Sequence, residues 1–163
     1  MIVRLVGSEM CIRDSYSGPI IEIKNLNTFF SDSAKVRFKL KSDLYQVFTS
    51  GEEIYPNGLK MDIFSRNIDS VSAIFSANHV IKYPDENYYK AVGDVILLNI
   101  NTNDELRTEE LFWYPNDEKF ISEKFVTIKT GNEVHSGEGM VSNQDFSDYE
   151  ILKPSGVIEI DEN

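Results

Sequence analysis

Three runs of alternating apolar residues between positions 91 and 129 constrain the fold of this chain more than any other feature. The runs cover residues 91–100, 106–114 and 120–129. The polar clusters between them, at 101–104 and 115–118, end strands because their side chains compete for backbone hydrogen bonds. No helical period of apolar residues joins the runs. The segment therefore predicts a meander of short antiparallel strands.

The same alternation occurs earlier in the chain. Apolar and basic side chains alternate in residues 35–41, which is the period of a strand with one wet and one buried face. Apolar residues alternate again in 59–63 and 73–77, and Pro-Asn-Gly at 56–58 predicts a turn. These runs extend the predicted sheet toward the N-terminus.

A helix is conceivable only in residues 104–114, where several glutamates lie close together. The run Leu-Phe-Trp-Tyr at 111–114 favours a strand with a bulge instead. Gly137 and Gly139, two residues apart, indicate a bulge or a close backbone contact. Strands of ordinary length give about ten to twelve elements. The sequence thus predicts an all-β, antiparallel fold, either a twisted two-sheet sandwich or a more open sheet.

Length and composition limit the classes of function. A chain of 163 residues is long enough for one domain with one core. No apolar run approaches the roughly 20 residues that cross a bilayer. The net charge of −11 would repel a phosphate backbone, and no basic stripe is evident in the sequence to offset it, so nucleic acid is not expected as a partner. The acidity itself is explained by solubility, with a positively charged partner as the alternative.

Residues 1–15 fit neither a strand nor a helix pattern. The segment at 5–15, which contains the only cysteine, Cys11, resembles a translated sequencing adapter, so residues 1–15 are predicted to be an assembly artefact and residues 16–163 the native domain. The alternative is a damaged targeting segment. If the artefact interpretation holds, the domain contains no cysteine, and thiol catalysis and disulfides are not expected.

Candidate catalytic residues are few. His79 and His135 are the only general bases near neutral pH, and neither occurs in a recognisable nucleophile motif. His79 shares the parity of Ala73, Phe75 and Ala77, which favours a partly buried strand histidine over a catalytic one. No hydrolase elbow, paired metal-binding histidines or phosphate-cradling glycine loop is present in the sequence. We therefore predict a protein that is not an enzyme, with no cofactor and no metal.

One calcium-like spacing needs to be weighed. Asn99, Asn101, Asn103, Glu105 and Glu110 fall at positions 1, 3, 5, 7 and 12 of a calcium loop. Position 6 is aspartate instead of glycine, position 1 is not aspartate, and strands flank the segment instead of helices. A polar hairpin tip is the favoured interpretation.

The ten phenylalanines leave two possibilities for the interior. A tightly closed sandwich of this size does not need so much aromatic bulk, which suggests an open-mouthed fold with an apolar groove. Phenylalanine also simply fills cores. Composition alone does not choose between an open groove and a filled core.

The order of several short segments resembles the lipopolysaccharide export protein LptC family, particularly its Bacteroidetes-type members. The resemblance covers roughly residues 33–160, and no single motif carries it. The segments are 91–95, 106–113, 120–122, 126–128, 137–139 and 143–146.

This resemblance implies a periplasmic jellyroll of two antiparallel sheets whose apolar interior carries the acyl chains of lipopolysaccharide. It also implies docking to the inner-membrane lipopolysaccharide ABC transporter of the LptB/LptF/LptG type, and transfer to a periplasmic bridge protein of the LptA type. An N-terminal membrane anchor is expected in the family and is missing from this chain, which the predicted artefact explains.

An acyl chain needs a continuous apolar lane, because each methylene left in water costs about 0.8 kcal/mol. Strand parity predicts the side chains of such a lane, and ordinary core packing is the alternative for each of them. The candidates are Val36, Phe38, Leu40, Leu59, Met61, Ile63, Ala73, Phe75, Ala77, Val95, Leu97, Val126 and Ile128.

Open sheet edges offer unpaired backbone groups to which a neighbouring protein can add a strand. The candidates for such an edge are Tyr149, Ile151, Val157, Ile158 and Ile160. Two other classes stay open: a non-catalytic β-sandwich for protein binding or adhesion and, third, a carbohydrate-active enzyme with two facing carboxylates.

Overall fold

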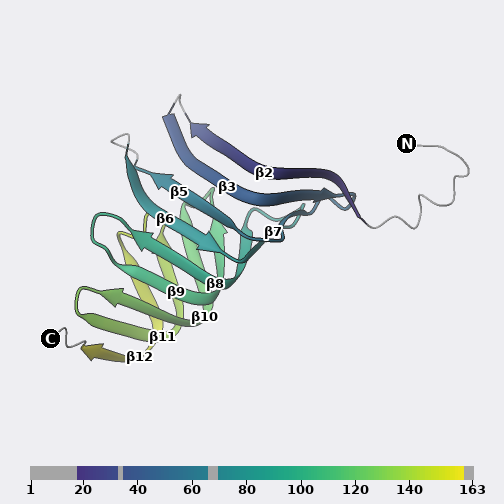
Figure 1. Ribbon diagram of the computed structural model, residues 1–163. Coiled ribbons are helices and arrows are strands. Elements are labelled where there is room, and N and C mark those ends of the chain that lie inside the picture. The colour runs from purple at the N-terminus through teal and green to yellow at the C-terminus, as the bar shows by residue number, and fades with distance from the viewer. Residues whose placement is uncertain (1–17, 33–34, 66–69, 160–163) are drawn as a thin grey trace, which may run out of the picture.

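The computed structural model describes residues 18–32, 35–65 and 70–159. These residues form eleven strands and no helix, and all the strands belong to one antiparallel sheet (Figure 1). The predicted artefact at 1–15 lies outside the described residues. The strands are β2 (Pro19–Asp32), β3 (Lys35–Phe48), β4 (Glu53–Tyr55), β5 (Leu59–Phe64), β6 (Val71–Ala77), β7 (His79–Lys82), β8 (Tyr89–Asn99), β9 (Glu105–Tyr114), β10 (Lys119–Thr130), β11 (Glu133–Asn143) and β12 (Tyr149–Glu159).

The order of strands across the sheet nearly follows the order along the chain. From β8 to β12, consecutive strands pair as a meander. β8 pairs on its other side with both β6 and β7, and β3 pairs with both β5 and β4, since each short strand covers half of its long neighbour. β2 pairs with β3. Among the described strands, β2 and β12 are therefore the two edges.

The sheet folds along a line of irregular backbone positions that crosses its strands. Between β4 and β5, Gly58 has a φ of 83° and its N–H donates to the Tyr55 carbonyl at 2.9 Å. Asn78 interrupts β6 and β7, and β8 has a bulge at Gly93 and Asp94 with φ values of 84° and 45°. Bulges of this kind bend a strand and increase its twist. The bends produce two facing leaves, with β4 and β7 in one and β5 and β6 in the other.

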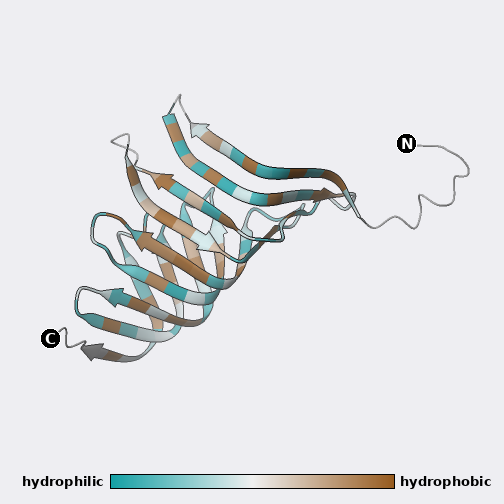
Figure 2. Ribbon diagram, in the orientation of Figure 1, coloured by the Kyte–Doolittle hydropathy of each residue, from teal (hydrophilic) through white to brown (hydrophobic). Residues whose placement is uncertain are grey.

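The core lies between the two leaves. Hydropathy alternates along most strands, so one face of each leaf is apolar (Figure 2). Buried residues of both leaves form one hydrophobic cluster that extends from β3 to β11 and includes the β11–β12 loop. None of the described segments is a helix long and apolar enough to cross a membrane.

Most strand predictions are confirmed. The runs 91–100, 106–114 and 120–129 are β8, β9 and β10, and residues 104–114 contain no helix. The predicted turn at 56–58 is present. Gly137 is also confirmed as a close contact, because a Cβ there would lie 2.5 Å from the Lys153 carbonyl oxygen, and the register of β11 and β12 shifts beside it.

One detail of the predicted pattern is wrong. His79 does not share the face of Ala77, because the strand breaks at Asn78 and Val80 turns into the core instead. The side chain of His79 is half-buried. The edge strand β12 runs through Pro154-Ser155-Gly156 with a shift in register against β11.

Candidate functional site: the apolar inner face

The inner face of the folded sheet carries unbroken rows of apolar side chains. Directly paired residues of neighbouring strands point to the same face, so a row can be followed from strand to strand through the register. One row crosses six strands from β3 to β10, and none of its side chains is more than 3% exposed. Its members are Leu40, Met61, Phe75, Leu97, Leu106 and Ile128. Burial of each such side chain contributes about 1.5–3 kcal/mol.

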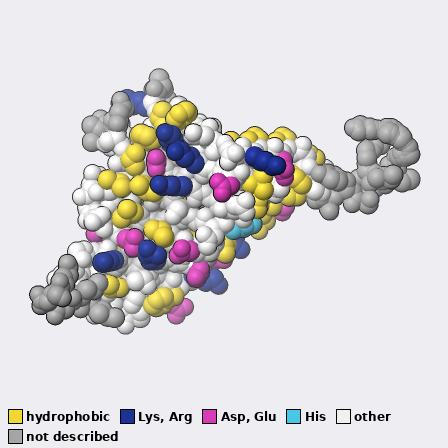
Figure 3. Space-filling view, in the orientation of Figure 1, with side chains coloured by type: hydrophobic (Ala, Val, Ile, Leu, Met, Phe, Trp, Pro, Cys, Tyr) yellow, Lys and Arg dark blue, Asp and Glu magenta, His cyan; other side chains and the backbone are white. Residues whose placement is uncertain are grey.

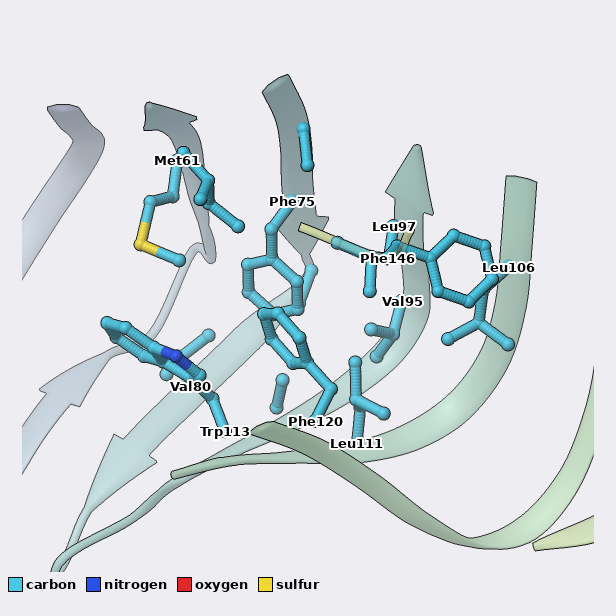
Figure 4. Packing of buried hydrophobic residues seen from close by; sticks show 14 of the residues in the cluster. Met61, Phe75, Val80, Val95, Leu97, Leu106, Leu111, Trp113, Phe120 and Phe146 are labelled. Atoms are coloured by element: carbon cyan, nitrogen blue, oxygen red, sulfur yellow. The ribbon is translucent and has the colours of Figure 1, made fainter. Parts of the chain in front are cut away.

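A line of aromatic rings joins the two leaves and reaches the sheet edge. Phe75 of one leaf stacks on Phe120 of the other, with centroids 5.5 Å apart (Figure 4). Trp113 lies 6.3 Å from Phe120 and 5.0 Å from Phe38. Phe38 in turn contacts Phe30 of β2 at 6.5 Å. Phe38 is half-buried and Phe30 is 43% exposed, so the apolar inner face becomes open to solvent at β2.

Three tyrosines line the interior near β4. The rings of Tyr45 and Tyr55 lie 5.0 Å apart, and the Tyr45 hydroxyl donates to Oε1 of Glu53 at 2.6 Å. Burial, followed by this hydrogen bond, raises the pKa of Tyr45, and burial raises the pKa of Tyr55. Burial also raises the pKa of Tyr89 to about 12. All three hydroxyls are thus neutral over the physiological range, and they make this part of the interior amphipathic.

The loop between β11 and β12 closes one end of the interior. Phe146 is fully buried although its φ is 57°, and its ring stacks on Tyr149 at 4.7 Å. Gln144 accepts a buried hydrogen bond from Nε1 of Trp113 at 3.0 Å. The side chain of Asn99 donates to the Asp145 carbonyl at 3.0 Å. These bonds hold the loop against the core.

The described residues of the two leaves pack closely around a small cavity. It measures about 10 Å³, which is close to the minimum for one water molecule. Among the described residues, the interior around this cavity is therefore a filled core. The cavity is lined by Leu40, Leu59, Met61, Phe75, Val80, Tyr89, Ala91 and Trp113.

The structure brings eleven of the thirteen lane candidates together in the buried cluster. Phe38 is half-buried against that cluster, and Val36 is 36% exposed near the β2–β3 connection. Contact of any of these residues with lipid stays a prediction. The eleven are Leu40, Leu59, Met61, Ile63, Ala73, Phe75, Ala77, Val95, Leu97, Val126 and Ile128.

Several residues of the same cluster were not among the sequence candidates. Leu106 and Thr108 face inward in β9, and so do Leu111 and Trp113, because the strand changes parity beside the β8 bulge. A strict alternation rule misses such a change, although the expected bulge was a signal for it. Phe146 carries no periodic signal because it lies in a loop. The residues missed are Tyr55, Val80, Ala91, Leu106, Leu111, Trp113, Phe120, Met140 and Phe146.

The predicted partner edge lies on β12, an edge strand among those described. Tyr149 and Ile151 pack against the core, so their side chains are not free for a partner. Val157 is 58% exposed. Ile160 and the side chain of Ile158 lie outside the described residues. Strand addition at this edge stays a prediction.

The calcium-like segment is a hairpin tip. The side-chain oxygen of Asn99 accepts hydrogen bonds from the backbone N–H groups of Asn101 and Thr102 at 2.8 and 2.9 Å, which shapes the turn. Across the described ranges, no three His, Cys, Asp or Glu side chains are grouped to hold a metal ion.

The geometry defines a class of fold, a jellyroll made from one folded antiparallel sheet with an apolar inner face. No family model and no curated protein matches the chain. Among solved structures, the chain is similar to LptH of Pseudomonas aeruginosa, described as the LptA-homologous periplasmic component of the conserved lipopolysaccharide transport device.

The similarity to LptH covers 82% of this chain and 100% of that chain, with a TM-score of 0.54 and 10% sequence identity. At this identity the likeness concerns the fold. The all-β, antiparallel jellyroll predicted from the sequence is therefore confirmed as an LptA-like fold. The comparison does not single out the LptC family.

Proposed function

We propose that this protein is a periplasmic component of lipopolysaccharide transport and that its inner face receives the acyl chains. The observation that carries the proposal is the apolar surface that runs without interruption from the buried row to the exposed ring of Phe30. The likeness of the fold to LptH, whose description names lipopolysaccharide transport, supports the same function.

Acyl chains enter, in this proposal, by separating the two leaves at their rim. The filled interior has no room for them otherwise. The rim is held partly by polar contacts: the Arg37 Nη2 to Glu118 Oε1 ion pair of 3.7 Å, with Glu118 42% exposed, and the Gln144–Trp113 hydrogen bond. An ion pair with one exposed partner, such as Arg37–Glu118, contributes at most about 1 kcal/mol. Lipid methylenes then replace the contact between Phe38 and Trp113.

The finer assignment follows the LptC resemblance. The protein accepts lipopolysaccharide from the inner-membrane ABC transporter and passes it to the periplasmic bridge protein. An N-terminal anchor keeps the protein associated with the inner membrane. The edges β2 and β12 are the places for strand addition by these neighbours, because their outer backbone groups have no partner strand among those described.

Mass spectrometry of co-purified lipid tests the proposal. The chain is directed to the periplasm of a lipopolysaccharide-producing host and purified without detergent. Lipid A species are expected with the wild type and the Phe125→Gln variant, and a several-fold smaller amount with Phe30→Gln. Phe125 is a matched control because it is an exposed phenylalanine, 54% accessible, in the irregular part of β10 and outside the core cluster. Absence of lipid A, or equal loss in both variants, contradicts the proposal.

A protein-binding or adhesion module is the second candidate, since large apolar side chains are exposed on both edge strands. It predicts a co-purified protein and no lipid A in the same experiment.

A further inference from the structure

A basic patch lies on the outer face of β3 and β5, although the protein has a net charge of −11. Lys39 and Lys41 alternate with the inward-facing Phe38 and Leu40 along β3, and Lys60 of β5 lies opposite Lys41. Lys and Arg side chains gather over these strands on the face shown in Figure 3. This concentration of positive charge is unexpected in so acidic a chain.

None of the three lysines forms an ion pair with a described residue. Lys39 stands over the ring of Phe29 at 5.9 Å and lies opposite Asp62 in the register of β3 and β5. Lys41, in contrast, pairs directly with Lys60, and neither forms an ion pair with any residue in the described ranges. Like charges placed directly opposite each other destabilise a sheet. An anion that lies between the two ammonium groups would relieve this repulsion.

The two lysines line a depression of about 460 Å³ at the fold line of the sheet. This volume lies in the range of small-molecule sites, about 300–1,000 Å³, and exceeds what a bare phosphate fills. The polar lining combines donors and one acidic acceptor. Its polar side chains include Asn25, Asn27, Lys41, Asp43, Asn57 and Lys60.

The walls of the depression are held in place by short contacts. The Ser42 hydroxyl donates to the Gly58 carbonyl at 2.7 Å and ties β3 to the β4–β5 turn. Gly58 approaches β6 so closely that a Cβ there would lie 2.0 Å from the Ala77 carbonyl oxygen. A site whose frame is fixed in advance loses less entropy on binding.

We propose that this depression binds a phosphorylated sugar. The ammonium groups of Lys41 and Lys60 neutralise the phosphate, and the side-chain amides of the asparagines bond to sugar hydroxyls. Asp43 repels a bare anion but accepts hydrogen bonds from hydroxyl groups. The polar side chains of the depression therefore favour a ligand that carries a phosphate and hydroxyl groups together. The sugar is either free or the headgroup of a glycolipid. This inference adds to the proposed function and does not rest on it.

Titration of the ¹⁵N-labelled chain, followed by NMR, tests the site. The probes are N-acetylglucosamine 1-phosphate, inorganic phosphate, N-acetylglucosamine, and diphosphorylated lipid A in detergent micelles. The phosphosugar should shift the amides of residues 25–27, 41–43 and 57–60 and bind at least about fivefold more tightly than phosphate or sugar alone. Binding should weaken as salt is raised, because the lysines are exposed.

Charge variants identify the groups responsible. The Lys41→Gln/Lys60→Gln double variant should bind the phosphosugar about tenfold more weakly. The Lys129→Gln/Lys153→Gln variant changes the net charge equally at exposed lysines outside the depression and should bind within twofold of the wild type. The inference is overturned if the 41/60 variant binds normally, if both variants weaken binding equally, or if phosphate alone binds as tightly as the phosphosugar.

The lipid A arm distinguishes the sources. Shifts of the same amides with lipid A identify a lipid-borne sugar, and shifts with only the soluble probe identify a free one; both support the site. Absence of shifts with both overturns it. The amount of co-purified lipid A is expected to depend on Phe30 and not on these lysines. The phosphosugar site and the transport proposal can therefore be refuted independently of each other.

Discussion

Tyr55 is buried to 4% exposure, yet its hydroxyl has no hydrogen-bond partner among the described residues. Burial raises its pKa above the ordinary value of about 10. A phenol whose pKa is higher in the folded state than in the unfolded state stabilises the fold below pH 10, and that stability is lost as pH rises above it. Burial also raises the pKa of Tyr45 and of Tyr89, so both side chains contribute to stability in the same direction. The protein should therefore lose stability progressively above about pH 10.

The Tyr55→Phe variant tests this account of alkaline stability. At pH 7 its free energy of unfolding should equal or slightly exceed that of the wild type, since no hydrogen bond is lost. Its loss of stability above pH 10 should be smaller. Urea unfolding at both pH values measures the difference. A loss of more than about 1 kcal/mol at pH 7 would reveal a partner for the hydroxyl and refute the assignment.

Phe146 fixes the β11–β12 loop by inserting its ring into the core. The Phe146→Ala variant should lose about 3–5 kcal/mol of unfolding free energy, because a buried aromatic ring is replaced by a cavity. Phe125→Ala, at an exposed position, should stay within about 0.5 kcal/mol of the wild type. Urea midpoints at unchanged slope report both values. Equal, small effects in the two variants would show that the loop does not close the interior.

At the scale of elements, the turn between β4 and β5 depends on Gly58. Its φ is 83°, and a Cβ would meet the Ala77 carbonyl, so Gly58→Ala should cost well over 1 kcal/mol. Gly131 also has a positive φ, of 50°, but a Cβ there has no neighbour within 4 Å. Gly131→Ala should therefore cost only about 1 kcal/mol.

Thermal unfolding of the two alanine variants compares these costs. The midpoint should fall several degrees further for Gly58→Ala than for Gly131→Ala. The same order should appear in urea. If the two variants melt together, the close approach of the turn to β6 does not contribute to the fold.

How much of each element could be predicted depends on whether its backbone is regular. Residues 38–41 and 59–63 alternate, and their side chains lie on the predicted faces, whereas Val36 is 36% exposed and Arg37 is largely buried beside a shift in register. At Asn78 and at the β8 bulge, the backbone breaks the two-residue period of the strand. Alternation along the sequence therefore could not predict on which face of the sheet His79 and Trp113 lie. It could not predict the burial of Phe146 either, because a loop has no such period. These irregular positions are also the ones that fold the sheet.

The paired lysines of the outer face illustrate a different limit. Lys41 and Lys60 are separated in sequence, and their pairing depends on the register between β3 and β5. For this reason, the two lysines do not form a basic stripe in the sequence. The depression that they line is a property of the folded chain alone.

At the scale of the whole molecule, the sheet has one continuous apolar face and two described edges. Both leaves contribute to a single core, so separation of the leaves exposes the entire inner face at once. This arrangement suits transient contact with acyl chains, since the protein's own side chains cover the apolar surface whenever no lipid is present.

The central claim is that the inner face contacts the acyl chains of lipopolysaccharide. Photo-crosslinking in a lipopolysaccharide-producing host tests it directly, with benzoylphenylalanine placed at Phe30, Phe38 or Phe125 in three separate variants. Each replaces an aromatic ring by a larger one, and circular dichroism confirms that each variant is folded. The account predicts crosslinks to lipopolysaccharide at Phe30 and Phe38 and none above background at Phe125. Crosslinks of equal yield at all three positions, or crosslinks at Phe125 alone, would contradict it.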